Sequence, residues 1–379
     1  MLIFNIYQIT NVLMSNSNII KAPGVLKLFG EHAVVYGRKC TAIAIKKYAT
    51  AKITTYKKNL MLINLEDKKQ AFEIDKNLAL SIRNLYNKNF NPFFTYSDLI
   101  KEYTKLNNSA EKIALNKDLI NELCAYGFIV SNFIEKNINV FGLCIKINSN
   151  IPERKGLASS ASCFVAFASA LSKKSSKKLS DKEIIEAARS GEIVIHKNKN
   201  AGRIDTAASY FGGLISYKNG SIFKYNIHKI KKLKNVDLII IDTGPKKTTA
   251  KTVAHVANLY NKNKISVEKI FSKIELCSVK GTSALLHGQF KEFGNEMYIN
   301  QDLLAALNLS TKNLDSAISI CKTNNAYGAK LSGGGGGGIA ISFIDKKKSK
   351  FLIDELNKNN FKAFKSKISE IGAKYFINK

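Results

Sequence analysis

The chain has 379 residues, 45% of them hydrophobic, and a formal net charge of +30 at pH 7. This length and apolar content predict one large or two medium domains with a proper core. Only five of the 59 basic residues are arginine. Arginine is favoured where a protein binds bases or phosphates through two parallel hydrogen bonds. Without an RNP motif, zinc-finger spacing or basic arm, the lysines indicate a solvated surface, so we expect neither nucleic acid nor a membrane as partner.

Cysteine spacing and hydropathy predict the compartment. The six cysteines lie far apart without a C-x-x-C pair, as is typical of thiols in a reducing compartment. The first 13 residues lack a basic region and a small-residue cleavage site, so they do not predict a signal peptide, and Met14 is a second candidate start. No apolar run has the length of a membrane span. We therefore expect a cytoplasmic protein.

Strand signals dominate the first part of the chain. β-branched residues alternate over ATAKITTY, residues 49–56, which is typical of a half-buried strand. Residues 84–117 are polar and rich in asparagine, which predicts an insertion with some helix. The expected elements are strands over 19–27, 40–57 and 140–147, a further hairpin within 59–73, and a helix over 121–136.

Helices and strands alternate in the rest of the chain. Ser180, with Glu183 three residues later, forms a capping box that predicts a helix ending near residue 196. Mixed strands with interspersed helices predict an α+β fold in two domains. The other expected elements are helices over 160–171, 250–260, 267–287, 303–307 and 314–322, strands over 214–217, 236–242, 327–331 and 339–343, and a last strand-and-helix unit.

The opening stretch APGVLKLFGEHAVVYG, residues 22–37, places Lys27, Glu31 and His32 among apolar residues. Ionisable side chains in such surroundings are costly unless they have partners or a function. The rest of the chain offers candidate partners in a small-residue loop, an acid and a glycine run, described next.

The small-residue loop GLASSAS, residues 156–162, leads straight into a predicted helix. Unpaired backbone N–H groups at the positive end of a helix dipole suit a phosphate, and the lack of bulk lets it approach the backbone. An ordinary helix N-cap in a tightly packed loop is the alternative. The chain has neither a G-x-x-x-x-G-K-[ST] motif nor the H-R-D and D-F-G signatures of protein kinases.

Glu192 lies on an otherwise apolar helix face shared with Ile185, Ala188, Ile195 and His196. A carboxylate directed into a core needs a cation, and Mg²⁺ beside a nucleotide is a natural one. The alternative is a partnership with a buried lysine or a backbone donor.

Asp205 follows a Gly202-Arg203-Ile204 turn and precedes a predicted helical segment. Taken alone, this position favours a helix N-cap. The functional alternative is an acceptor for a hydroxyl proton in phosphoryl transfer.

Six consecutive glycines, residues 333–338, separate two strand-like segments. Such a run has a high conformational entropy and contributes nothing to a core. Because both flanks look buried, a backbone that passes very close to another loop or to a phosphate explains the run better than an exposed linker does.

Together these stretches resemble the GHMP small-molecule kinases and, within them, the mevalonate kinase branch. The motifs appear in the family's order: A-P-G…G-E-H, then P-x-x-x-G-L-x-S-S-A, then G-A-K-L-[ST]-G-x-G-G-G-G. The stretch LFGEHAVVYG is similar to that branch, whereas galactokinase relatives carry G-E-H-T-D-Y. The matching motifs extend from Lys21 to about Phe343, which is most of the chain.

The resemblance implies a two-domain GHMP kinase fold with ATP and substrate between the domains. Residues 1–225 would form a ribosomal protein S5 domain 2-like domain and residues 226–379 a ferredoxin-like one. The implied activity is ATP-dependent phosphorylation of mevalonate to 5-phosphomevalonate in isoprenoid biosynthesis. Alternatives are another GHMP kinase (mevalonate 3-kinase, phosphomevalonate kinase or a sugar kinase) or a non-catalytic basic binding protein on a kinase scaffold. A homodimer is left open.

The resemblance also assigns roles to individual residues. Ser160 and Glu192 match the Mg²⁺ ligands, and Asp205 matches the catalytic acid. The positions that match the substrate site are Glu31, His32, Asp205, Thr249 and Gly334. The positions that match the ATP phosphate site are Pro152, Lys155, Gly156, Leu157, Ala158, Ser159, Ser160, Ala161 and Ser162.

The chain departs from the family pattern at several positions. Val25 stands where the family usually has the basic residue beside the catalytic Asp, and Lys27 comes two residues later. Because residues i and i+2 of a strand share a face, we predict that Lys27 supplies this charge. Lys155 stands where small residues are common, Ala158 where glycine is usual, and Gly334 where alanine is usual.

Overall fold

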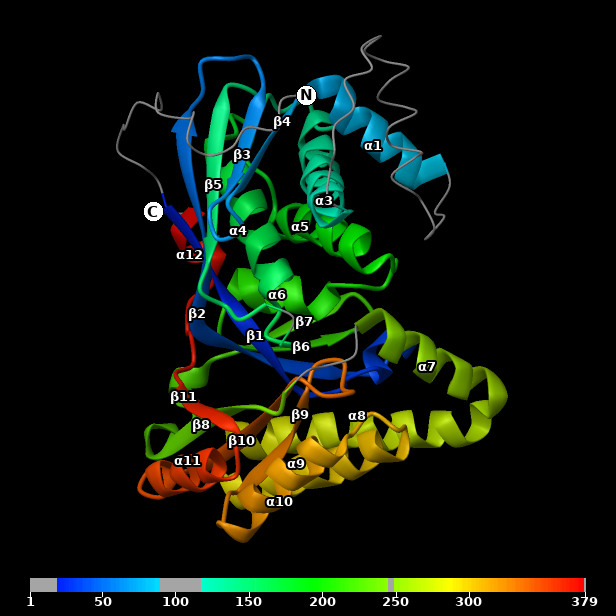
Figure 1. Cartoon of the computed structure of the whole chain (residues 1–379), viewed down its shortest axis with the longest axis vertical. Helices are drawn as coiled ribbons and strands as arrows, with labels where there is room; N and C mark the ends of the chain where they lie inside the picture. Colours follow the sequence, from blue (N-terminus) through cyan, green and yellow to red (C-terminus); the bar gives the residue numbers. More distant parts are fainter. Residues whose placement is uncertain (1–18, 89–116, 154, 245–248, 378–379) are drawn as a thin grey trace.

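Two lobes, each with its own β-sheet, stack along the long axis of the molecule in a computed structural model (Figure 1). The structure describes residues 19–88, 117–153, 155–244 and 249–377. The predicted insertion, residues 84–117, therefore lies outside the described residues except for 84–88 and its last residue, 117. The predicted domain boundary, between residues 225 and 226, stays a prediction.

The first lobe contains a seven-stranded sheet in the order β4-β3-β5-β2-β6-β7, with β1 paired to β2. The long strand β2 organises it, because β1 follows it for most of its length while β6 pairs near its beginning and β5 near its end. The β3–β5 pair is parallel and the other pairs are antiparallel. The strands are β1 (Ile19–Phe29), β2 (Cys40–Thr55), β3 (Met61–Leu65), β4 (Gln70–Ile74), β5 (Leu143–Ser149), β6 (Leu214–Lys218) and β7 (Ser221–Tyr225).

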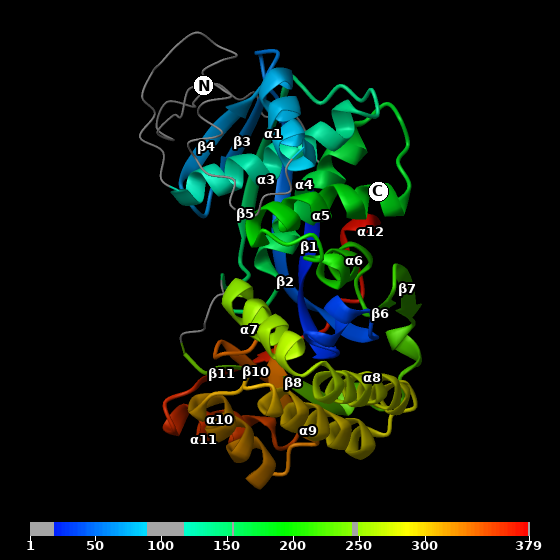
Figure 2. The same ribbon diagram turned by 90° about the vertical axis from the view of Figure 1, so that its right-hand side faces the viewer.

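Helices cover one face of this sheet (Figure 2). They are α1 (Lys76–Lys88), α3 (Lys117–Ile134), α4 (Ser159–Lys174), α5 (Asp181–His196) and α6 (Arg203–Phe211). Helix α4 lies deepest, packing on β1, β2, α5 and α6 with ten buried residues. The capping box at the start of α5 is confirmed: the Ser180 hydroxyl accepts from the Glu183 amide, and the Glu183 carboxylate accepts from the Ser180 amide.

The second lobe contains a fully antiparallel four-stranded sheet in the order β11-β8-β10-β9. With helices between β8 and β9 and between β10 and β11, this is the ferredoxin-like β-α-β-β-α-β arrangement, and the α+β prediction is confirmed. The strands are β8 (Val236–Asp242), β9 (Gly328–Ser332), β10 (Ile339–Asp345) and β11 (Lys362–Ser366). The helices are α7 (Thr249–Lys262), α8 (Lys264–Leu286), α9 (Phe290–Ala306), α10 (Lys312–Thr323) and α11 (Ser349–Lys358).

Most predicted elements are confirmed, and the largest error concerns α9. The sequence predicted a short helix at residues 303–307, whereas α9 begins at Phe290. Gly294 lies within the part of α9 that was not predicted, and a side chain there would collide with the Tyr327 carbonyl of the segment entering β9. The glycine therefore allows the helix to lie close to that segment. Strand β7 was not predicted.

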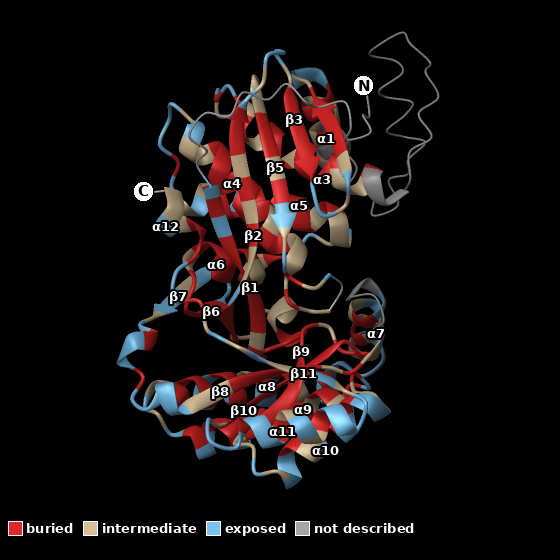
Figure 3. Ribbon diagram, turned by 60° about the vertical axis from the view of Figure 1, so that its left-hand side comes forward, coloured by how far each residue is buried: buried red, intermediate tan, exposed pale blue. Residues whose placement is uncertain are grey.

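The two lobes are joined by packing as well as by the chain. Helix α8 packs against β1 and β2, and the buried Thr41 hydroxyl lies 2.8 Å from Ser216, 3.0 Å from Ser278 and 2.8 Å from Thr282. A short last helix, α12 (Ala373–Ile377), returns to pack against α4 and β1 of the first lobe. Figure 3 shows that buried residues continue along the strands of both sheets.

The described residues also bear on membrane association and on the cysteines. None of their helices combines the length and the apolar character needed to cross a membrane. All six cysteines are free thiols, and five of them are buried.

Candidate active site

Strand β1 and helix α6 bring Lys27 and Asp205 together. The Lys27 ammonium lies 2.7 Å from one carboxylate oxygen of Asp205 and 2.8 Å from the other. Asp205 is not the N-cap of α6, so that alternative is wrong: Gly202 occupies the cap, and Asp205 lies in the first helical turn with its side chain directed to Lys27. Val25, two residues before Lys27, packs in a buried cluster with Ile204 of the same helix.

The Lys27–Asp205 pair is mostly enclosed, with 20% and 16% of the two side chains exposed. Burial alone would lower the pKa of Lys27, but the charge of Asp205 and its hydrogen bonds raise it, and the net pKa lies above the usual value. Lys27 therefore keeps its charge at physiological pH. Whether it replaces the basic residue that the family has at position 25 stays a prediction.

Glu31 lies deeper, in a buried ion pair with Lys330 of β9. Both side chains are essentially inaccessible, with 1% and 0% exposed. The Lys330 ammonium also donates to the Leu331 carbonyl at 2.6 Å. Burial lowers the pKa of Lys330, and the attraction of Glu31 offsets this only in part. The carboxylate of Glu31, which was predicted to lie near the substrate, is thus paired with Lys330.

His32 and Ser332 add further contacts: Ser332 joins β9 to β1, and His32 joins the segment after β1 to the segment after β9. The Nε2 atom of His32 lies 2.9 Å from the carbonyl oxygen of Gly334, so these two predicted substrate residues are brought together. The Ser332 hydroxyl accepts from the Lys27 amide at 3.0 Å and donates to the Lys27 carbonyl at 3.1 Å. The end of β9 thereby supports the strand that presents Lys27.

The small-residue loop, residues 156–162, leads into α4 as predicted. Ala158 caps the helix in a left-handed conformation with φ 56° and ψ 39°, without a side-chain hydrogen bond to the first turn. Two hydrogen bonds hold the loop on β1: the Leu157 carbonyl accepts from the Val25 amide, and the Ser162 hydroxyl donates to the Pro23 carbonyl. Ser160 remains partly exposed at the helix N-terminus. The arrangement offers amide donors and a hydroxyl to an anion.

The glycine run, residues 333–338, passes directly over this loop. A side chain on Gly333 would lie 3.4 Å from the Cα atom of Gly156, in contact with its backbone. Five of the six glycines have positive φ, and Gly334 is the exception, so the alanine usual at that position would fit the backbone. Close passage over the loop is the arrangement that the sequence predicted.

Glu192 is buried, with only one of its oxygens engaged. The engaged oxygen is Oε2, which lies 3.3 Å from the Nε2 atom of His196, one helical turn later. Burial alone would lower the pKa of His196, but the charge of Glu192 raises it above the usual value. Within the described part of the chain, the Oε1 atom of Glu192 is buried without a hydrogen-bond partner. A free carboxylate oxygen fits a cation ligand better than the pairing with a buried lysine that was the alternative.

No cluster of three or more His, Cys, Asp or Glu side chains suited to a metal occurs among the described residues. Mg²⁺ in nucleotide sites commonly uses one or two protein ligands, with phosphates and water completing the shell. Glu192 and the Ser160 hydroxyl fit that donor set, and their role as ligands stays a prediction.

Two other predicted nucleotide residues flank the loop. The Lys155 ammonium lies 2.9 Å from each carboxylate oxygen of Asp242, at the end of β8. Pro152 is partly buried just before the loop. Thr249 begins α7, but its side chain lies outside the described part of the structure.

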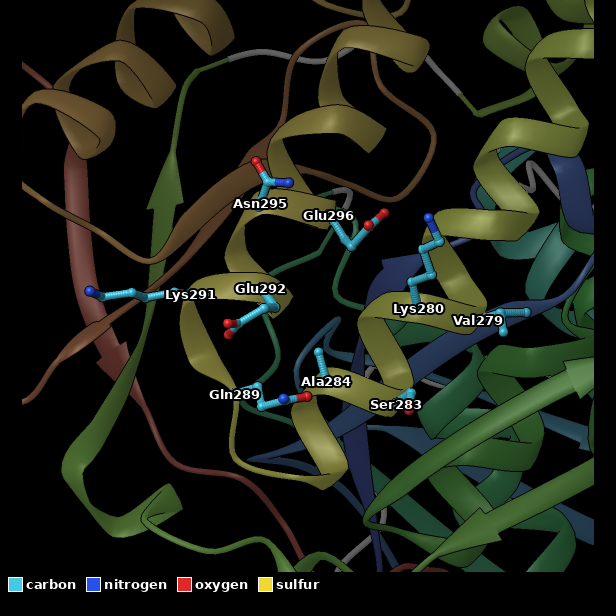
Figure 4. Close-up of a pocket in the computed structure, with 9 residues that line it drawn as sticks. All are labelled: Val279, Lys280, Ser283, Ala284, Gln289, Lys291, Glu292, Asn295 and Glu296. Carbon is cyan, nitrogen blue, oxygen red and sulfur yellow. The ribbon is translucent and has the colours of Figure 1, made fainter.

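Lys330 and Ser332 were missed by the sequence reasoning. Lys330 was detectable in principle, because a lysine inside the apolar strand GAKLS requires a partner, as Lys27 does in β1. A separate hollow between α8 and α9 (Figure 4) is lined by nine described residues, none of which is a predicted site residue. Four of them are charged: Lys280, Lys291, Glu292 and Glu296.

Comparisons with known proteins give consistent results. Residues 123–213 match the model of the GHMP kinases N terminal domain, and residues 282–363 match that of the GHMP kinases C terminal domain. The mevalonate kinase of Methanocaldococcus jannaschii is 31% identical over 353 residues, which cover 91% of this chain and 98% of that protein. The mevalonate kinase of Pyrococcus furiosus is 29% identical over 338 residues, covering 87% and 90%.

Solved structures agree in fold. The crystal structure of the Methanococcus jannaschii mevalonate kinase has a TM-score of 0.70 at 30% identity and covers 94% of this chain and 99% of that one. The crystal structure of L. major mevalonate kinase in complex with R-mevalonate has a TM-score of 0.64 at 21% identity and covers 94% of this chain and 97% of that one. At that identity the second likeness concerns the fold alone.

Proposed function

The chain belongs to the GHMP kinase family and phosphorylates mevalonate, and we propose that it transfers the γ-phosphate of ATP to the C5 hydroxyl group, giving 5-phosphomevalonate for isoprenoid biosynthesis. The Lys27–Asp205 pair carries this proposal. It places a fixed cation and a carboxylate on β1 and α6, and the amide of Val25 on the same strand bonds to the predicted phosphate loop.

In the proposed reaction, the substrate hydroxyl oxygen forms a bond to the γ-phosphorus while the bond from that phosphorus to the ADP oxygen breaks. The hydroxyl proton passes to the carboxylate of Asp205, which returns it to solvent after ADP leaves. Lys27 orients this carboxylate and offsets the negative charge near the transferring group. Because ionised Asp205 raises the pKa of Lys27, Lys27 is an ammonium when the substrate hydroxyl group approaches.

Residues 156–162 would hold the ATP phosphates through the backbone amides that begin α4, and the glycine run supports that loop from the second lobe. Phosphoryl transfer depends mostly on positioning and electrostatic stabilisation, so fixed amides are well suited to it. Ser160 and Glu192 would hold Mg²⁺, which when bound neutralises charge on the phosphates.

We further propose that the enzyme works in the cytoplasm without nucleic-acid or membrane partners. The six free thiols support a reducing compartment. Light scattering of the purified protein decides between a monomer and a homodimer.

The activity is tested with a coupled ADP-release assay that offers mevalonate, phosphomevalonate or galactose, followed by mapping of the phosphate in the product by ³¹P and ¹³C NMR. We expect turnover on mevalonate with the phosphate on C5. Brisk turnover on another substrate and none on mevalonate would overturn the proposal, and a phosphate on C3 would correct the position.

Lys27→Ala tests the assignment of the basic residue. We expect a loss of about 10²-fold in kcat, the scale of a positioned charged group in transition-state stabilisation. Lys136→Ala is the matched control, because Lys136 forms an ion pair with Glu183 at 2.6 Å at the opposite end of α5 from Glu192. Near-full turnover of Lys27→Ala would remove Lys27 from the mechanism.

A further inference from the structure

Lys155 and Asp242 form an ion pair between the lobes at the edge of the phosphate loop. Lys155 directly precedes Gly156, and Asp242 is the last residue of β8. The ammonium lies 2.9 Å from each of the two carboxylate oxygens.

The two partners differ in how firmly they are held. Asp242 accepts a second hydrogen bond from the Gly244 amide at 3.0 Å. The next residue, Thr243, donates its amide to the Gly338 carbonyl at 2.9 Å and accepts from Asn313 at 3.1 Å. Lys155 instead carries its charge on a flexible four-carbon stem. The ammonium can therefore move while the carboxylate stays in place.

The charges around Lys155 set up a competition. An ammonium has three donors, and the two carboxylate oxygens engage two of them. The pair is partly exposed, with 32% and 24% of the side chains accessible, so solvent weakens it. A nucleotide whose phosphates lie on residues 156–162 brings several negative charges next to the residue that starts this loop.

We propose that Asp242 and the nucleotide phosphates compete for the Lys155 ammonium, so that Lys155 strengthens nucleotide binding and Asp242 weakens it. The inference rests on the proposed function, because it takes residues 156–162 as the phosphate site. Asp242 acts here through Lys155, as a residue that adjusts affinity for ATP and eases the release of ADP.

Opposite effects of the two substitutions test this. Titration calorimetry measures the binding of ADP and of a non-hydrolysable ATP analogue to the full-length protein and its variants. We expect Lys155→Met to bind about 10-fold more weakly, the scale of one charge-assisted hydrogen bond. Asp242→Asn should bind about threefold more tightly, because it releases the ammonium. The double variant should resemble Lys155→Met.

A matched control pair lies at the other end of the same strand. Asp237 of β8 pairs with Lys365 of β11 at 2.8 Å, and Asp237→Asn and Lys365→Met should leave nucleotide affinity within about twofold of the parent. Thermal unfolding establishes that each variant is folded. A merely structural ion pair would make both Lys155→Met and Asp242→Asn shift affinity in the same direction or not at all, and either result overturns the inference.

The titrations, read together with the coupled ADP-release assay, separate this inference from the proposed function. A parent protein that binds nucleotide but does not phosphorylate mevalonate contradicts only the assigned substrate. A parent that phosphorylates mevalonate while the two variants fail to shift in opposite directions contradicts only the competition. Raising the salt concentration should reduce the difference between the variants, because exposed charges are screened.

Discussion

Two lysine–carboxylate pairs lie near the same end of β1, and their surroundings give them different properties. The mouth pair, Lys27 and Asp205, is partly accessible, with 20% and 16% of the side chains exposed. The interior pair, Lys330 and Glu31, is closed off, with 0% and 1% exposed. Both pairs join segments far apart in the sequence. Accessibility distinguishes the two pairs, since only the mouth pair remains partly exposed.

The pKa values of the two lysines shift in opposite directions, in line with this difference in exposure. Burial lowers both, but in the mouth the charge and hydrogen bonds of Asp205 raise the pKa of Lys27 above its usual value. In the interior the desolvation of Lys330 outweighs the attraction of Glu31, and its pKa falls. The lysine thus keeps its charge more readily where the pair stays partly accessible to water, whereas the closed pair connects two segments of the fold.

Neutralising the acid of the mouth pair should have the largest effect. We expect Asp205→Asn to lower kcat by about 10³-fold, within the range for a general base, while the protein stays folded. Steady-state kinetics with mevalonate and a thermal melt provide the measurements. A kcat within tenfold of the parent would show that Asp205 does not accept the proton.

Breaking the interior pair should reduce stability instead. Lys330→Met leaves Glu31 buried without a cation, which typically costs about 3–5 kcal/mol of the free energy of unfolding. Urea denaturation measures this loss. The double variant Glu31→Gln with Lys330→Met removes both charges and should recover most of it. If the single variant lost less than about 1 kcal/mol, the interior pair would not be the connection described here.

The phosphate loop near the mouth contains backbone strain that a single substitution should relieve. Ala158 has φ 56°, where an L-residue costs about 1–2 kcal/mol that glycine avoids. The greater freedom of glycine in the unfolded chain offsets about 0.4–1 kcal/mol of this, so Ala158→Gly should stabilise the protein by about 0.5–1 kcal/mol in urea denaturation.

A helical alanine is the control for that experiment. Ala166, buried within α4, should lose at least about 1 kcal/mol on conversion to glycine. If Ala158→Gly destabilised the protein as Ala166→Gly does, the left-handed conformation at the start of α4 would carry no strain.

The smallest expected effect is a pH dependence of the interior pair. Because the folded pKa of Lys330 lies below 10.5, the unfolded chain binds more protons between these two values, and the associated penalty disappears as pH rises through that interval. The free energy of unfolding of the parent should therefore rise, relative to that of the double variant, between pH 7.5 and 9.5. Urea denaturation at both pH values measures it. A decreasing difference would mean that the folded pKa is raised.

Local sequence patterns predicted most of the elements. Alternating β-branched residues identified β2, the capping box identified α5, and an apolar run identified β8 with the bounds that the structure shows. These signals succeed because they depend on neighbours three or four residues away. The prediction of a short helix at 303–307 missed the first part of α9, which packs through Gly294 against the backbone of Tyr327, a contact between distant segments that local patterns do not show.

For the candidate site, the sequence predicted which residues take part but not how they pair. Residue types and motif order identified Lys27, Glu31, His32, Glu192 and Asp205 as groups that need partners. The pairs themselves were not predictable: Lys27 contacts a residue 178 positions away, and Glu31 one that is 299 positions away. Ser332 lies within the quoted G-A-K-L-[ST]-G motif, but nothing local showed that its hydroxyl would bond to the backbone of Lys27, 305 positions away.

By itself the sequence determined the α+β class and the order of the motifs. It also identified the charged residues that lie among apolar ones and would cost free energy to bury without partners. Only the tertiary structure decided which charge meets which and how much water reaches each pair. The physical reason is that periodicity and capping are local, whereas desolvation and ion pairing depend on segments that the fold brings together from both lobes. The same two residue types, lysine and a carboxylate, therefore form one pair at the mouth of the site and another in its interior.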